Sequence, residues 1–160
     1  MRKLSEIKRG LVIIIIVAGI LGFADATYLS ILHFANIVPP CSILQGCEKV
    51  TTSRYSVIAG VPLALVGTIY YLAIFILSVA YLDKRKIILI KIVGGLSVLA
   101  FLGSLALIYL QLFVIGSICP YCMFSALTST TIFVSVLLAY FQKPKVLAGQ
   151  TKDSVGIDLH

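Results

Sequence analysis

The segment LVIIIIVAGILGFADATYLSIL, residues 11–32, decides the fold class because its only charged side chain is Asp25. A helix needs about 20 apolar residues to cross a bilayer. Three further apolar stretches occupy residues 61–82, 87–108 and 123–141. The chain has 160 residues, 60% hydrophobic and 12% charged, and its mean hydropathy is +1.10. The sequence therefore predicts an all-α integral membrane protein with a bundle of four transmembrane helices.

The basic residues predict how this bundle is oriented. The net charge is +7, with 13 Lys and Arg against 6 Asp and Glu. If both termini are cytoplasmic, only Lys49 and Arg54 lie outside the cell. Short loops rich in Lys and Arg stay inside, so we expect four spans with residues 41–60 in an extracytoplasmic loop. No basic stripe interleaved with aromatic residues is present, which argues against nucleic-acid binding.

Proline residues mark two predicted helix boundaries. Pro39 and Pro40 end the first helix, since proline lacks the amide donor that helix propagation needs. Gly60-Val61-Pro62 opens the second, with Pro62 expected in its first turn. The loop between them is long and partly apolar, which favours a lid or short helix folded over the bundle. Apolar sequence continues past Ala24-Asp25-Ala26, so we expect a retained first helix and not a cleaved signal peptide.

Two cysteine pairs lie at the predicted extracytoplasmic edge. Cys119-Pro120-Tyr121-Cys122 places proline at an initial helical position, so Cys119 should cap the fourth helix with Cys122 in its first turn. The positive end of a helix lowers thiol pKa values and makes such pairs reactive. Cys41 and Cys47 lie in the outer loop, where disulfides persist. This placement suggests that electrons pass from protein thiols to an acceptor in the lipid.

Two other interpretations of the cysteines stay open from the residues alone. Both pairs could be disulfides that only brace the outer face of a non-enzymatic tetraspan protein. Four sulfurs could also form a tetrahedral zinc site, although the Cys41/Cys47 spacing is unusual and no histidine accompanies either pair. We expect no metal. Neither a flavin nor a nicotinamide motif is present, which favours a quinone as the electron acceptor.

Several motifs together resemble the vitamin K epoxide reductase family, particularly its stand-alone prokaryotic disulfide-forming members. The matching pieces cover most of residues 11–141. They are Asp25-Ala26-Thr27-Tyr28-Leu29-Ser30 with His33, Cys41-x5-Cys47, Ser53, Gly60-Val61-Pro62-Leu63-Ala64 and Cys119-Pro120-Tyr121-Cys122.

The resemblance implies an enzyme, a quinone-dependent thiol-disulfide oxidoreductase with a quinone enclosed by four helices. Cys41 would meet a thioredoxin-like carrier protein, Cys47 would exchange with Cys119, and Cys122 would contact a ubiquinone, menaquinone or similar acceptor. Ala126 stands where the vertebrate enzymes have a tyrosine, so the resemblance does not extend to epoxide reduction or coumarin sensitivity. The resemblance also implies a membrane oxidoreductase domain at residues 1–142, followed by a polar cytoplasmic tail at 143–160.

A second group of residues is predicted around the quinone. Ser53 matches a family serine or threonine near the quinone, although a loop hydroxyl that caps a short helix would look the same. Tyr70, Tyr71 and Ile115 could supply ring faces and apolar walls. Asp25 is costly inside a membrane and is therefore a candidate for function, unless it only reaches interfacial water or a hydroxyl such as Thr68. His33 could transfer protons, or it could simply anchor its helix at the interface.

Overall fold

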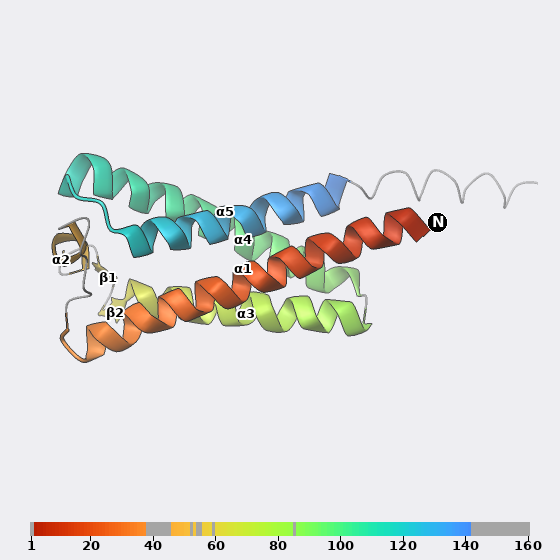
Figure 1. Cartoon of the computed structure of the whole chain (residues 1–160), viewed down its shortest axis with the longest axis horizontal. Coiled ribbons are helices and arrows are strands. Elements are labelled where there is room, and N and C mark those ends of the chain that lie inside the picture. Colours follow the sequence, from red (N-terminus) through yellow and green to blue (C-terminus); the bar gives the residue numbers. More distant parts are fainter. Residues whose placement is uncertain are drawn as a thin grey trace, which may run out of the picture.

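The chain folds into a bundle of four long helices (Figure 1). The computed structural model describes residues 2–37, 46–51, 53, 56–58, 60–84 and 86–141. All four helices contain segments long and apolar enough to cross a membrane. The predicted all-α architecture is therefore confirmed. The helices are α1 (Arg2–Phe34), α3 (Leu63–Lys84), α4 (Ile87–Tyr109) and α5 (Pro120–Phe141).

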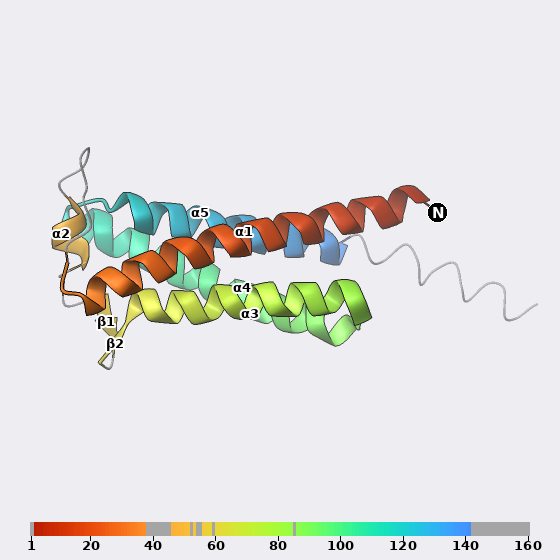
Figure 2. The same cartoon turned by 60° about the horizontal axis from the view of Figure 1, so that its bottom comes forward.

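The helices alternate in direction and enclose a common interior. Helix α1 packs against α3 and α5, and α4 packs against the same two helices. The start of α1, the α3–α4 turn and the end of α5 lie at one end of the bundle in both views (Figures 1 and 2). The opposite end carries three short elements: α2 (Gly46–Thr51), β1 (Val57–Ile58) and β2 (Val61–Pro62).

The outward faces of the helices are apolar, and several polar side chains point inward. Ile69 and Leu99, for example, are 61% and 69% exposed. This distribution suits a lipid surround, because the membrane core offers polar side chains no hydrogen-bond partner. The buried polar residues are Ser30, Ser78, Ser97, Gln111, Thr128, Ser129 and Ser135.

Tyr71 connects three of the helices at the centre of the bundle. Its side chain is 1% exposed, and its hydroxyl donates a hydrogen bond of 2.7 Å to the Ser125 carbonyl on α5. The Thr128 Oγ1 atom lies 2.8 Å from the same hydroxyl. On α1, a Cβ atom at Gly22 would overlap the Tyr71 ring, so glycine permits this close approach. Such close packing and hydrogen bonding holds helices together in lipid.

The structure corrects one predicted helix boundary and lengthens another span. Pro62 does not lie in the first turn of α3: it pairs with Val57 as the last residue of β2, and α3 begins at Leu63. The third span extends beyond the apolar stretch at residues 87–108. It continues to Tyr109 and then as the π-helix η2 (Leu110–Ile115), because helix-compatible residues persist until Gly116 adopts a left-handed φ of 65°.

The end of the bundle that carries α2 contains the predicted short helix and a hairpin that sequence reasoning did not anticipate. Helix α2 ends at Thr51, whose hydroxyl donates to the Cys47 carbonyl (2.7 Å). The Ser53 hydroxyl donates to the Val50 carbonyl, also at 2.7 Å. Strands β1 and β2 pair antiparallel. Cys41 and the predicted tail at 143–160 lie outside the described residues.

Candidate functional site

The Cys119-Pro120-Tyr121-Cys122 motif forms the start of α5. Pro120 is the first helical residue, so Cys119 occupies the capping position that the sequence predicts. The Cys119 carbonyl accepts a bond of 3.1 Å from the Met123 amide, which is the first hydrogen bond of the helix. The motif therefore lies at the positive end of the helix dipole.

A π-helix holds the backbone of this motif in place. Gln111 of η2 is 2% exposed, and its Oε1 atom accepts a hydrogen bond of 2.9 Å from the Cys119 amide. The Gln111 carbonyl accepts bonds from the Gly116 and Ser117 amides. One residue thus satisfies three backbone donors in the connection that leads to α5. Sequence reasoning missed Gln111; a polar residue inside an otherwise apolar segment was the signal that could have found it.

Helix α2 brings Cys47 against the motif. Cys47, Val50 and Cys119 form one buried cluster, in which Cys47 is 1% exposed and Cys119 is fully buried. Cys47 is disulfide-bonded, whereas Cys119 and Cys122 are free thiols. The structure thus places Cys47 and Cys119 side by side, although they lie more than 70 positions apart in the sequence. Their proximity agrees with the placement expected from the sequence, while the roles of the four cysteines stay a prediction.

The pKa of the Cys119 thiol is lowered. Hydrogen bonding from the Cys122 thiol lowers the pKa of Cys119 to about 7. The Cys122 and Tyr121 amides also lower this pKa, whereas burial and the charge of Asp25 raise it. Since a thiolate is the nucleophile in disulfide exchange, Cys119 is suited to react with a disulfide placed beside it.

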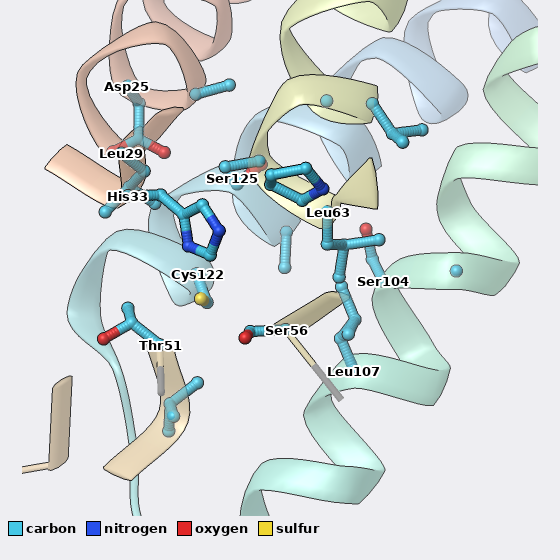
Figure 3. Close-up of a pocket in the computed structure, with 18 of the residues that line it drawn as sticks. Asp25, Leu29, His33, Thr51, Ser56, Leu63, Ser104, Leu107, Cys122 and Ser125 are labelled. Carbon is cyan, nitrogen blue, oxygen red and sulfur yellow. The ribbon is translucent and has the colours of Figure 1, made fainter. Parts of the chain in front are cut away.

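A cavity of about 950 Å³ lies within the bundle, and α2 forms part of its wall. Within the described part of the chain, Cys122 lines this cavity and Cys119 does not. Figure 3 shows His33 and Cys122 pointing into it from α1 and α5, with Thr51 of α2 beside Cys122. All four residues predicted to contact a quinone line the cavity, namely Ser53, Tyr70, Tyr71 and Ile115.

The two neighbouring tyrosines differ in their hydrogen bonds. Tyr71 is bonded to α5, whereas the buried Tyr70 hydroxyl has no hydrogen-bond partner among the described residues. The buried Oδ2 atom of Asp25, which also lines the cavity, likewise has none. Thr68 does not satisfy Asp25, because its hydroxyl bonds to the Ala64 carbonyl and Ser30. Of the two alternatives to a functional role of Asp25, the one in which it reaches the Thr68 hydroxyl is therefore not supported.

The chain was compared with known proteins. The sequence model of the Vitamin K epoxide reductase family matches residues 13–137. The chain belongs to this family. Members of the vitamin K epoxide reductase family are oxidoreductases that work with thiol partners and quinones. The comparison with curated proteins found no match to this chain.

The family match covers every element that builds the site. It includes α2 with Cys47, the π-helix with Gln111, and the motif from Cys119 to Cys122. In this family member, no three His, Cys, Asp or Glu side chains within the described residues cluster as metal ligands would. The described part of the site places two thiols, Cys119 and Cys122, beside a mostly apolar cavity.

Proposed function

We propose that the protein is a membrane thiol:quinone oxidoreductase that oxidises a thioredoxin-like carrier and reduces a membrane quinone, which supports disulfide bond formation. One observation carries the proposal. The motif separates two environments, since Cys119 packs against Cys47 of α2 and Cys122 opens onto the cavity. A dithiol in this position can exchange with a protein disulfide on one side and meet an apolar acceptor on the other.

The proposed electron route begins outside the bundle. The carrier dithiol reduces the Cys41/Cys47 disulfide, and the carrier becomes oxidised. The Cys47 thiolate then attacks an oxidised Cys119–Cys122 pair at Cys119 and forms a mixed disulfide, which Cys41 resolves. The Cys41/Cys47 disulfide forms again, and Cys119 and Cys122 are left as thiols. The oxidised Cys47 and the free Cys119 and Cys122 of the structure correspond to this last stage.

The cavity fits a quinone in volume and polarity. Ligand pockets of about 300–1,000 Å³ with mostly apolar walls are usual for small molecules, and this cavity measures about 950 Å³. Val66 on α3 and Leu99 and Gly103 on α4 line the cavity and are also exposed. The cavity therefore reaches the lipid-facing surface between these helices, where a long apolar tail can extend. A bound quinone would accept two electrons and two protons.

The charge distribution supports an extracytoplasmic site. Exposed Lys84 and Lys86 border the α3–α4 turn, at the end of the bundle opposite to α2. Loops rich in Lys and Arg stay in the cytoplasm. We therefore place the protein in the cell membrane with four spans, both termini inside and the cysteines outside. That side is also the compartment in which protein disulfides are made.

The test is quinone-dependent oxidation of a reduced thioredoxin-like carrier by the purified protein in lipid. We expect Cys119→Ala and Cys122→Ala to abolish turnover. Thr131→Ala should not change it, because that hydroxyl is exposed and bonds within α5. A visible charge-transfer band between thiolate and added quinone should disappear in Cys122→Ala. Full turnover in either cysteine variant would mean that the disulfides only brace a non-enzymatic membrane protein.

A further inference from the structure

Two residues that line the same cavity from different helices each carry a buried polar atom without a hydrogen-bond partner. Asp25 Oδ2 belongs to α1 and Tyr70 Oη to α3; both atoms are buried, and both residues line the cavity. Among the described residues one other buried side-chain oxygen has no partner, Thr27 Oγ1, and Thr27 does not line the cavity. Figure 3 shows Asp25 on the same helix as Leu29 and His33, on the wall that faces Ser125.

Nearby hydroxyls that might have satisfied these atoms are bonded elsewhere. Ser30 bonds to the Ala26 carbonyl and to Thr68, and Thr68 bonds to the Ala64 carbonyl. The Tyr71 hydroxyl is held by Ser125 and Thr128. A carboxyl group without a partner is unfavourable in a membrane interior and usually marks a functional position. The fold therefore keeps a carboxyl and a phenol available to whatever occupies the cavity.

We propose that Asp25 and Tyr70 form the proton-transfer site for the quinone, an inference that rests on the proposed function. Tyr70 donates a hydrogen bond to one quinone oxygen. The Asp25 carboxylate takes up a proton that the thiols release and transfers it to that oxygen as electrons arrive from Cys122. In the complete reaction the S–H bonds of Cys119 and Cys122 break and one S–S bond forms. Two electrons and two protons reach the quinone, so the protons released by the thiols balance those taken up.

The titratable groups around Asp25 can supply a proton to its carboxylate. Tyr70 and Tyr71 of α3 and Cys122 of α5 line the cavity together with Asp25, and Cys119 and Tyr121 at the start of α5 are close enough to interact with its charge. The residues of α4 that line the cavity carry no titratable side chain. His33 lies two helical turns further along α1, about 12 Å toward the outer end, and lines the same cavity. After each turnover the Asp25 carboxylate takes up a proton released by the thiols or delivered through His33.

Three variants separate proton transfer from binding. Asp25→Asn keeps the shape and a hydrogen-bond donor but cannot transfer a proton. We expect it to lower kcat for quinone reduction on the order of 10²-fold, with KM unchanged, and to make the rate fall as pH rises because water becomes the proton source. Tyr70→Phe should raise KM severalfold. Thr27→Val, which removes the unpartnered hydroxyl away from the cavity, should leave both constants unchanged.

Two measurements keep this inference distinct from the proposed function. Exchange between a reduced carrier and Cys47 needs no quinone, so it should be equal in wild type and Asp25→Asn. Infrared difference spectra should show a carboxyl band that shifts when quinone is added and is absent in Asp25→Asn. If the wild-type band does not respond to quinone, or if Asp25→Asn matches wild type in kcat and pH profile, Asp25 is not the donor. If wild type reduces no quinone at all, the proposed function itself fails.

Discussion

The hydrogen bond from the Cys119 amide to Gln111 should govern both the stability and the shielding of the reactive pair. The bond measures 2.9 Å between two buried residues, and Gln111→Leu would remove its acceptor with little change in volume. A buried donor left without a partner costs about 1–3 kcal/mol. We therefore expect the free energy of unfolding in detergent to fall by about this amount. Cys119, now fully buried, should also react faster with an alkylating reagent.

A neighbouring position supplies the control for this experiment. Leu112 lies in the same π-helix and is 47% exposed, so Leu112→Met should change the unfolding free energy by less than about 0.5 kcal/mol. Gln111→Glu retains an acceptor oxygen and should protect Cys119 better than Gln111→Leu does. The reasoning is refuted if Gln111→Leu unfolds and alkylates as wild type does, since the bond would then not hold the motif.

Two further predictions concern the pH dependence of Cys119 and the lipid-facing opening of the cavity. The Cys119 pKa is lowered from 9.0 to about 7, so the folded state favours the thiolate and the alkylation rate should rise through pH 7 and level off above it. Cys122→Ala removes the main cause and should move this midpoint to higher pH; an unmoved midpoint would contradict that cause. Gly103 lines the opening, and a Cβ there meets nothing within 4 Å, so Gly103→Leu should fold normally and slow reduction of long-tailed quinones more than tailless ones. Gly95→Leu, equally uncrowded but away from this cavity, is the control, and equal slowing by both variants would argue against a tail path at Gly103.

Tyr70 and Tyr71 show where sequence reasoning about the site reached its limit. Both were predicted to line a quinone cavity; both line the cavity of the structure, and its occupant stays a prediction. Adjacent residues on a helix point about 100° apart, so only Tyr71 reaches α5 and forms hydrogen bonds there. Tyr70 keeps its hydroxyl unpartnered among the described residues. The sequence contains two identical side chains, and only the hydrogen bonds that Tyr71 makes across the bundle to α5 give them different chemistry.

The cysteines show a similar division between local and tertiary information. Pro120 predicts the start of α5 and the capping position of Cys119 by local backbone rules alone. The burial of Cys47 against Cys119 depends on how α2 folds back over the bundle. The Gln111 bond also depends on a π-helix, which shifts the register of the last turn before Gly116. No local pattern in the sequence anticipates that shift.

The sequence by itself determined the number of membrane helices, because spanning a bilayer sets the length of an apolar segment. It also indicated that both cysteine pairs lie at one edge, because alternating spans bring every second connection to the same side. Only the tertiary structure decided which helix faces surround the cavity. In a soluble protein an apolar stripe marks the buried face, but here lipid and core are equally apolar. Interhelical packing and hydrogen bonds therefore select the inward faces, and through them the placement of Asp25, Tyr70 and Cys122.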